Sequence, residues 1–169
     1  SNPFYVAKRV GINKKPFNMI KIRSMTINAD KSGVLSTSND DKRITGVGKF
    51  IRKFKLDELS QLLNVISGQM SFVGPRPNVI EEVALYSSEE LELLNVKPGI
   101  TDFSSIIFSD EGNILEGSNN PDLDYNQLIR PGKSMLGIFY IKNMNFILDI
   151  KLIFLTLLSI INRKKTLLK

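Results

Sequence analysis

The chain has 169 residues, a length that suits one compact domain, and 42% of them are hydrophobic, enough to build a core. It contains neither histidine nor cysteine, which excludes disulfides, thiolate nucleophiles, histidine bases and metal sites built from these residues. Any catalytic acid, base or nucleophile must therefore be Asp, Glu, Lys, Tyr, Ser or Thr. The formal charge of +6 points to an anionic partner such as a nucleotide, a nucleic acid or an anionic membrane surface, although a basic but inert surface would give the same value.

The first third of the chain predicts one strand, one loop and one short helix. Residues 17–25 roughly alternate and are partly β-branched, which predicts a strand that carries Lys21 and Arg23. The polar residues 27–41 predict a mobile loop. A short basic helix is predicted for residues 47–54.

Residues 56–66 form the clearest helical pattern. Apolar side chains recur there at helical spacing, at Leu56, Leu59, Leu62, Leu63 and Ile66. We expect Leu56, Leu59 and Leu63 to lie on the buried side, and Gly68 to end the helix.

Turns and short helices are predicted for the middle of the chain. The two prolines of segment 74–77 fix the backbone and predict a rigid turn. Helices are predicted at about 78–86 and 88–94, the second with Ser88 as its N-cap. Residues 97–102 are rich in turn formers and predict another turn.

The C-terminal part combines a polar loop, residues 112–124, with a strongly apolar helix, residues 146–161. Arg163, Lys164 and Lys165 follow that helix. One interpretation is a core helix. The other is a helix lying in a membrane interface, which the trailing basic residues favour. No apolar run is long enough to predict a membrane-spanning helix.

Asp57 and Glu58 are the first candidate site residues. Acidic side chains are common in the first turn of a helix, where they complement its dipole, and that structural explanation is an alternative to function. Consecutive residues of an α-helix project about 100° apart, so the two carboxylates diverge. One can then attack a substrate while the other holds a cation, and the free N–H groups of the same helix end can receive a phosphate.

A second constellation is basic and consists of Arg43, Lys49, Arg52, Lys53 and Arg76. A solvated charged face is the usual explanation of such residues. Arg76 differs because prolines on both sides restrict its backbone, as a phosphate clamp requires, although an ordinary surface turn is the alternative.

These residues resemble the motifs of bacterial sugar transferases, the monotopic phosphoglycosyl transferases that start glycan assembly on a polyprenyl carrier. The resemblance covers nearly the whole chain, and its central block is long and ordered. The matching pieces are Pro16-Phe17 with Lys21-Ile22-Arg23-Ser24-Met25, Asp41-Lys42-Arg43-Ile44-Thr45 with Gly48-Lys49-Phe50-Ile51-Arg52, Leu56-Asp57-Glu58-Leu59, Gln61-Leu62-Leu63-Asn64-Val65, Gly68-Gln69-Met70-Ser71-Phe72-Val73-Gly74-Pro75-Arg76-Pro77, Lys97-Pro98-Gly99-Ile100-Thr101 and Asp149-Ile150-Lys151.

The resemblance implies an enzyme that moves sugar 1-phosphate from a UDP-sugar to polyprenyl phosphate through a covalent aspartyl phosphosugar, with release of UMP, as the first membrane step of surface glycan assembly. It implies that Asp57 is the nucleophile and that Glu58 binds Mg²⁺. The implied phosphate-binding residues are Lys21, Arg23, Arg43, Arg52 and Arg76. A carboxylate nucleophile, a metal held by few protein ligands and catalysis by positioned charge are all consistent with phosphoryl transfer.

For the architecture we expect an α-rich α+β fold over residues 1–169, one catalytic domain with a small sheet or hairpin and amphipathic helices that face a membrane. Relatives begin with a hydrophobic segment that enters the membrane and returns, and the short polar residues 1–15 cannot form it. We therefore expect a fragment that lacks this segment and is itself soluble. The full-length protein is expected at the cytoplasmic face of the bacterial inner membrane; its oligomeric state stays open.

Three positions depart from the family pattern. Asp102 follows Thr101 where many relatives have glycine, and residues 109–111 read Ser-Asp-Glu where relatives have Gly-Arg-Asn, so this block is expected to influence nucleotide or sugar selectivity. Lys55 replaces a small helix-capping residue, which leaves the helix cap unexplained.

Two other functions compete with the transferase. A nucleic-acid-binding module would use the basic charge with exposed aromatic residues, but most Phe residues here lie in apolar patterns, so no nucleic-acid partner is expected. A catalytically silent scaffold at the membrane would not need Asp57, Glu58 or Arg76.

Overall fold

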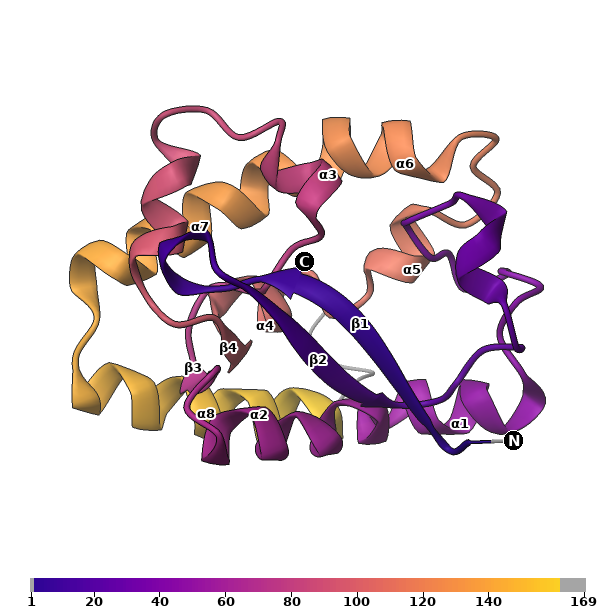
Figure 1. Cartoon of the computed structure of the whole chain (residues 1–169), viewed down its shortest axis with the longest axis horizontal. Coiled ribbons are helices and arrows are strands. Elements are labelled where there is room, and N and C mark those ends of the chain that lie inside the picture. The colour runs from indigo at the N-terminus through magenta and orange to yellow at the C-terminus, as the bar shows by residue number, and fades with distance from the viewer. Residues whose placement is uncertain (1, 162–169) are drawn as a thin grey trace.

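A long antiparallel hairpin crosses the middle of the molecule, between a lower and an upper layer of helices (Figure 1). The structure is a computed structural model that describes residues 2–161. The hairpin consists of β1 (Phe4–Val10) and β2 (Pro16–Ile22). The lower layer contains α1 (Gly46–Lys53), the 3-10 helix η3 (Leu56–Gln61), α2 (Leu62–Ile66) and α8 (Phe146–Ile161). The upper layer contains α3 (Ile80–Val83), α6 (Pro121–Asp124) and α7 (Arg130–Asn143). The expected α-rich α+β class is confirmed.

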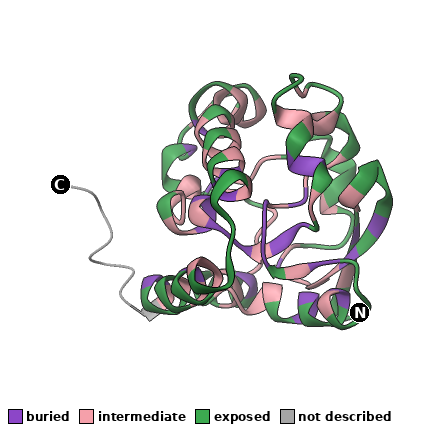
Figure 2. Cartoon of the chain, turned by 90° about the vertical axis from the view of Figure 1, so that its left-hand side faces the viewer, coloured by how far each residue is buried: buried purple, intermediate pink, exposed green. Residues whose placement is uncertain are grey.

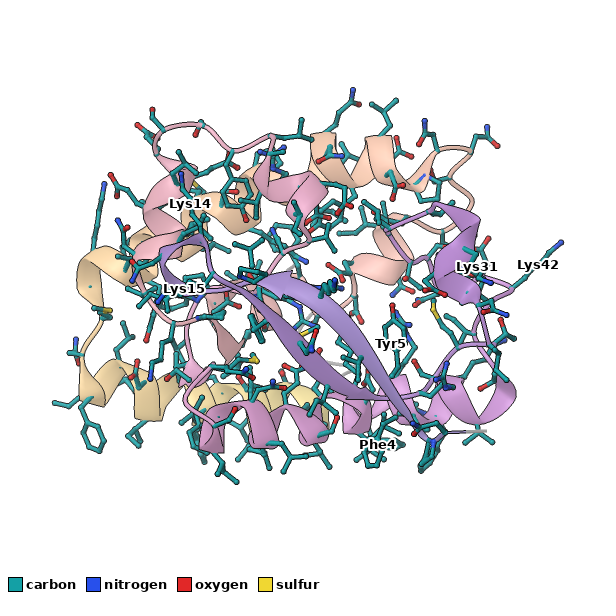
Figure 3. All side chains as sticks on the ribbon, viewed as in Figure 1. Phe4, Tyr5, Lys14, Lys15, Lys31 and Lys42 are labelled. Carbon is teal, nitrogen blue, oxygen red and sulfur yellow. The ribbon has the colours of Figure 1, made fainter. Side chains whose placement is uncertain are left out.

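The hairpin confirms the strand predicted at residues 17–25, but β2 ends at Ile22, and its partner β1 was not predicted. The two strands pair from Phe4 opposite Ile22 to Val10 opposite Pro16. One face of the hairpin is apolar and builds a core cluster of Ala7, Phe17, Met19 and Met70. Figure 3 shows the hairpin with its side chains, among them Tyr5 and the turn lysines Lys14 and Lys15.

The segment predicted as a helix at residues 56–66 is helical, but it begins as η3 and becomes α2 only at Leu62. The prediction for its buried side is wrong: Leu59 and Leu63 are exposed, Ile66 is 83% exposed and Leu56 is only half-buried. The buried side chains are polar, namely Ser60, Gln61 and Asn64. The reason is positional, since the polar side of this segment lies against the backbone of β2. Gly68 ends the segment in a left-handed conformation, as predicted (φ 75°).

Asn64 joins this segment to the hairpin. Its side chain, 2% exposed, accepts a hydrogen bond from the N–H of Ile20 (3.0 Å) and donates to the carbonyl of Asn18 (2.8 Å). Its amide also donates to Oε1 of Gln69 (2.8 Å), and Ser60 Oγ donates to the carbonyl of Ile20 (2.9 Å). The edge of β2 that β1 leaves free is therefore hydrogen-bonded by side chains of the helical segment, as buried backbone groups require.

The two turn-rich blocks of the sequence meet in a short parallel pair, β3 (Ser71–Val73) and β4 (Gly99–Thr101). The turn predicted over 97–102 is therefore partly a strand, and the rigid turn predicted at 74–77 is an irregular segment with a bend at Gly74. Glycine is needed where the blocks touch, because a Cβ on Gly99 would lie 2.1 Å from the nitrogen of Gly74.

The remaining elements correct several predictions. Within 78–86 only α3 is helical. The helix predicted at 88–94 is the 3-10 helix Glu90–Asn95, whose N-cap position is Glu89, not Ser88. Ser87 and Glu90 bond reciprocally across the turn before it: Ser87 Oγ accepts from the N–H of Glu90, and Glu90 Oε2 accepts from the N–H of Ser87.

Other short helices were missed because each has too few residues for a periodic pattern. The predicted loops 27–41 and 112–124 contain the 3-10 helix Ala29–Ser32 and the helices α5 (Glu111–Ile114) and α6. The short helix α4 (Phe103–Ile107) was not predicted either. Length does not explain why α7 was missed, since it has 14 residues; its first turn contains Pro131 and Gly132, which are typical of turns.

The helices α1 and α8 confirm their predictions, α8 with identical bounds. Leu152 of α8 is fully buried in a second core cluster with Val73 and Tyr140. The Tyr140 hydroxyl donates to Asp149 (2.8 Å), and the hydroxyls of Thr101 and Thr156 lie 2.6 Å apart. Arg163, Lys164 and Lys165 lie outside the described residues. Within residues 2–161, no helix combines the length and apolar character needed to cross a membrane.

An exposed apolar face runs along the lower layer. Figures 1 and 2 place α1, α2 and α8 at the same edge of the molecule in two perpendicular views. We call the following exposed side chains the lower apolar face: Val47, Phe50, Phe54, Leu59, Leu62, Leu63, Ile66, Phe72, Phe146, Ile147, Ile150, Phe154, Leu155, Leu157 and Leu158. So many exposed large apolar side chains at one edge are unusual for a monomeric soluble protein and mark an interaction site.

We predict that Asn64→Ala destabilises the domain by about 3 kcal/mol, because it leaves the N–H of Ile20 and the carbonyl of Asn18 buried without partners. Urea unfolding followed by circular dichroism measures the change. Asn95→Ala is the matched control, since Asn95 is exposed. Equal unfolding midpoints for the two variants would contradict the role of Asn64.

Candidate functional site

All seven site residues predicted from the sequence line one cavity of about 630 Å³. The hairpin contributes Lys21, and Arg23 follows β2. Helix α1 contributes Arg52, and the 3-10 helix η3 contributes Asp57 and Glu58. Arg43 and Arg76 come from irregular segments on either side of α1 and η3. The volume lies in the range of small-molecule and cofactor sites.

Lys55 produces the abrupt change of chain direction before η3, the 3-10 helix that contains Asp57 and Glu58. Its backbone is left-handed (φ 51°), a conformation that costs energy for a residue with a Cβ, and its side chain does not cap η3. Instead, Nζ donates to the carbonyl of Ser105 (3.1 Å), and the carbonyl of Lys55 accepts from the N–H of Glu58 (3.2 Å). Lys55 therefore turns the chain so that Asp57 and Glu58 enter the cavity.

Glu58 and Arg76 form an ion pair in the cavity wall, between Oε1 and Nη2. Burial alone would raise the pKa of Glu58, but Arg76 and Lys21 reverse the effect and lower that pKa to about 2. Glu58 in turn raises the pKa of Arg76 above its ordinary value. The pair stays charged at any physiological pH.

Asp57 has the opposite shift. Burial raises its pKa above the ordinary value, and the charge of Glu58 adds to this, although Lys21 and Arg52 act in the other direction. Two adjacent carboxylates with pKa values moved apart are a recurring arrangement in catalytic sites, because each can then take a separate role.

Lys21 completes the charged centre. Burial and the nearby Arg76 lower the pKa of its ammonium to about 8, while Glu58 and Asp57 oppose the shift. Lys21 follows Ile20, whose N–H and carbonyl are held by Asn64 and Ser60, so these hydrogen bonds determine where the ammonium lies.

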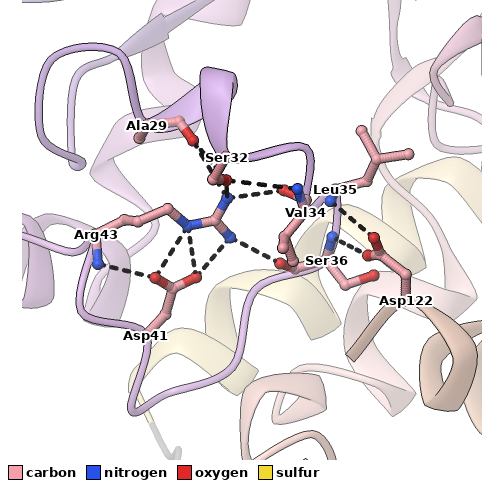
Figure 4. Close-up of polar contacts among 8 residues, drawn as sticks. All are labelled: Ala29, Ser32, Val34, Leu35, Ser36, Asp41, Arg43 and Asp122. Atoms are coloured by element: carbon pink, nitrogen blue, oxygen red, sulfur yellow. Dashed lines mark hydrogen bonds and ion pairs between the residues drawn. The ribbon is translucent and has the colours of Figure 1, made fainter. Parts of the chain in front are cut away.

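Arg43 lines the cavity, but its guanidinium is engaged by the protein (Figure 4). It pairs with Asp41 through Nε and Nη2, and it donates to the carbonyls of Val34 (2.7 Å) and Ser36 (3.0 Å) and to Ser32 Oγ (2.6 Å). These bonds organise the loop 27–41. The geometry therefore indicates a structural role for Arg43.

Arg23 is also held by the chain. Its Nε donates to the carbonyl of Asn2 (2.9 Å) and its Nη2 to the carbonyl of Phe4 (3.1 Å), and the guanidinium lies 5.9 Å from the centroid of the Tyr5 ring. Of the predicted phosphate-binding residues, Lys21, Arg52 and Arg76 are the ones that surround Asp57 and Glu58 electrostatically.

Asp57 and Glu58 provide the carboxylate oxygens for a candidate Mg²⁺ site. Within residues 2–161, no group of three or more acidic side chains converges to form a dedicated metal cage. Two carboxylates fit Mg²⁺ that arrives with a phosphate, because this ion commonly uses one or two carboxylates together with phosphate oxygens and water. One oxygen of Glu58, Oε1, already accepts from Arg76.

Several cavity residues were missed by the sequence analysis. Arg9, Glu82, Tyr125 and Lys133 line the cavity together with Glu111, which was noted only as a departure from the family pattern. Their positions along the chain carry no common signal, because β1, α3, η5 (Tyr125–Ile129, a π-helix) and α7 converge only in the folded chain.

Asp102, another departure from the family pattern, is explained by the fold. Its buried carboxylate is the N-cap of α4 and accepts from the N–H of Ser105 (2.8 Å) and from the hydroxyls of Ser104 and Ser105. Asp102 therefore stabilises the start of α4, whose residues Ser104 and Ser105 line the cavity.

Comparison with known proteins identifies the family to which the chain is similar. A family model described as bacterial sugar transferase matches residues 1–163. The chain is 35% identical over 158 residues to the "Uncharacterized sugar transferase EpsL" of Bacillus subtilis, covering 94% of the chain and 69% of that protein.

Two further relatives carry more specific names. The chain is 38% identical over 152 residues to the "UDP-glucose:undecaprenyl-phosphate glucose-1-phosphate transferase" of Klebsiella pneumoniae, covering 88% of the chain and 30% of that protein. It is 34% identical over 174 residues to the "Undecaprenyl-phosphate galactose phosphotransferase" of Salmonella typhimurium, covering 94% of the chain and 33% of that protein. The chain thus spans only about a third of the length of these two relatives.

Proposed function

Because the chain belongs to the bacterial sugar transferase family, we propose that its cavity transfers sugar 1-phosphate from a UDP-sugar to a polyprenyl phosphate. The observation that carries the proposal is the pair of adjacent carboxylates with opposite pKa shifts in a cavity lined by Lys21, Arg52 and Arg76. The names of relatives that act on undecaprenyl phosphate support the choice of acceptor.

In the first step, a carboxylate oxygen of Asp57 attacks the phosphorus that bears the sugar. The bond between this phosphorus and the oxygen bridging to the second phosphorus breaks, and UMP leaves with that oxygen. The product is an acyl phosphate that joins Asp57 to the sugar 1-phosphate. The raised pKa of Asp57 suits this role, because a more basic carboxylate is a better nucleophile once it is ionised.

In the second step, a phosphate oxygen of the polyprenyl phosphate attacks the phosphorus of the acyl phosphate. The bond to the Asp57 oxygen breaks, the carboxylate is restored, and the sugar is left on a polyprenyl diphosphate. Both steps proceed at phosphorus with charge on its oxygens, so their rate depends on positioned positive charge.

Lys21, Arg52 and Arg76 supply that charge. Arg76 is held by Glu58, which sets its orientation in the cavity wall before substrate binds. Lys21 has its pKa lowered to about 8, so it is largely protonated at neutral pH. Glu58 would hold Mg²⁺ when the ion is bound, and the ion would neutralise charge on the diphosphate.

The lower apolar face supplies the contact with the lipid. We propose that it rests in the cytoplasmic interface of the inner membrane, which would bring the membrane-held acceptor to the cavity. The support is the exposure of large apolar side chains along α1, α2 and α8, three helices at one edge of the molecule. This also explains why the leucines of the 56–66 segment point outward.

We predict that Asp57→Asn lowers UMP release by at least about 10³-fold, because the amide cannot act as the nucleophile. The assay uses the full-length protein in membranes with polyprenyl phosphate, Mg²⁺ and a panel of UDP-sugars. Asp40→Asn is the matched control, since Asp40 is exposed and does not line the cavity. Activity retained in Asp57→Asn would refute the nucleophile assignment, and silence of the folded wild type on every donor would favour a scaffold.

We predict that Glu58→Gln raises the Mg²⁺ concentration needed for half-maximal UMP release by about 10-fold or more, because the neutral amide is a poorer ligand for the ion. A Mg²⁺ titration of UMP release measures the change. Glu92→Gln, at an exposed position, is the control. An unchanged titration midpoint would exclude Glu58 as a metal ligand.

We predict that Phe50→Glu with Ile66→Glu lowers binding of the chain to vesicles of phosphatidylethanolamine and phosphatidylglycerol by about 10-fold or more, because each change places a charge in the interface. Vesicle sedimentation measures binding. Leu85→Glu is the control, since Leu85 is also exposed but follows α3 in the upper layer. Equal binding of both variants would place the membrane contact elsewhere.

A further inference from the structure

The cavity has a second charged wall that the transfer steps do not use. Glu111 of α5, Tyr125 of η5 and Lys133 of α7 all line it. We propose that this wall, the Glu111 subsite, binds hydroxyl groups of the uncharged part of the UDP-sugar. This inference rests on the proposed function and identifies Glu111 as a residue that recognises the UDP-sugar donor.

The Glu111 carboxylate can accept hydrogen bonds in addition to the one from Lys133. Lys133 Nζ donates to Oε2 of Glu111 and lies 5.2 Å from the centroid of the Tyr125 ring, so the ammonium is held between an acid and an aromatic face. The Lys133 side chain is 15% exposed, whereas the Glu111 side chain is 40% exposed. The bond to Lys133 thus orients Glu111, and the carboxylate keeps further acceptor positions toward the cavity.

Charge determines what Glu111 can bind. Burial would raise its pKa, but Lys133, Arg76 and Lys55 together lower it, so the carboxylate is ionised at neutral pH. An ionised carboxylate only accepts hydrogen bonds, and it repels phosphate. Within a UDP-sugar, its ligand is therefore a hydrogen-bond donor. Most of the donors that a UDP-sugar carries are the hydroxyl groups of the sugar ring and of ribose; the others are the N3–H of uracil and, in N-acetylated sugars, the amide N–H.

The two walls of the cavity carry opposite charge where they would meet the donor: Lys21, Arg52 and Arg76 in one wall, and the Glu111 carboxylate in the other. The electrostatic effect of Glu111 on Arg76 shows that the subsite lies within reach of the cationic end of the cavity. A donor whose diphosphate lies against Lys21, Arg52 and Arg76 would then extend its hydroxyl-bearing part toward Glu111. The reversed placement would bring the diphosphate against a carboxylate, so Glu111 favours one orientation of the donor.

A purely structural ion pair between α5 and α7 is the competing explanation. Partly exposed pairs of this kind contribute little to stability, typically about 0–1 kcal/mol. The two side chains are also exposed unequally, and the more exposed one, Glu111, lines the cavity. Binding measurements separate the two explanations, because a structural pair affects unfolding and not the recognition of a hydroxyl group.

The test measures binding without turnover. In full-length protein carrying Asp57→Asn, isothermal titration gives the Kd of UDP-glucose, UDP-galactose, UDP-N-acetylgalactosamine, UDP and 2′-deoxy-UDP, with and without Glu111→Gln. We expect Glu111→Gln to weaken the tightest UDP-sugar by about 10-fold or more, the cost of one hydrogen bond to a charged group. Glu116→Gln is the matched control, since Glu116 is exposed and does not line the cavity.

The pattern identifies the source of the hydroxyl. If Glu111→Gln weakens binding of the UDP-sugar but not of UDP, the hydroxyl belongs to the sugar ring. If it weakens binding of both UDP and the UDP-sugar but not of 2′-deoxy-UDP, the hydroxyl is the 2′-hydroxyl of ribose. Both outcomes support the subsite. Equal affinities with and without Glu111→Gln overturn it while leaving the proposed function standing. If the protein that carries Asp57→Asn alone binds no UDP compound at all, the subsite and the proposed function are both contradicted.

A second variant separates loss of ligand recognition from loss of stability. Lys133→Gln breaks the same ion pair but keeps the carboxylate. We expect it to weaken the UDP-sugar less than Glu111→Gln does. Equal losses of affinity in the two variants, with equal shifts of the thermal unfolding midpoint, would show that the pair is structural and would overturn the subsite.

Discussion

The hydrogen bonds between Asn64 and the free edge of β2 are the constraint on which the site depends. Asn64 bonds both Asn18 and Ile20, and Ser60 bonds Ile20 from the same helical segment. Because side chains alternate along a strand, a shift of one residue would turn Lys21 to the other face of the hairpin. The side-chain amide therefore sets the register that brings the Lys21 ammonium to Asp57 and Glu58.

This constraint reverses the usual arrangement of an amphipathic helix. The segment 56–66 buries Ser60, Gln61 and Asn64 and exposes most of its leucines. Polar groups are tolerated inside because they satisfy a strand edge that would otherwise be buried without partners. The outward leucines join apolar side chains of α1 and α8 in the lower apolar face. One segment therefore carries both the acidic pair of the cavity and part of the surface proposed to meet the membrane.

The charged centre follows from this geometry. Because they are buried close to one another, Glu58, Arg76, Lys21 and Asp57 shift one another's pKa values in opposite directions. Glu58 is used to hold Arg76, while Asp57 keeps a raised pKa. A division of roles between adjacent carboxylates therefore arises from their different neighbours, and not from their identity as Asp and Glu.

The amino-acid sequence limits the available chemistry and specifies the elements that have strong periodicity or end at glycine. The absence of histidine and cysteine left the carboxylates, and the motifs around Asp57, Glu58 and Arg76 identified the family that the comparison confirmed. Helices α1 and α8 and the end of the 56–66 segment at Gly68 were predictable because local spacing and glycine specify them. The folded chain was needed to show which face of the 56–66 segment is buried, that Arg43 organises a loop, and that Glu111 and Lys133 form an ion pair in the cavity wall. The physical reason is that burial and charge pairing depend on neighbours distant in the chain, which periodicity does not encode.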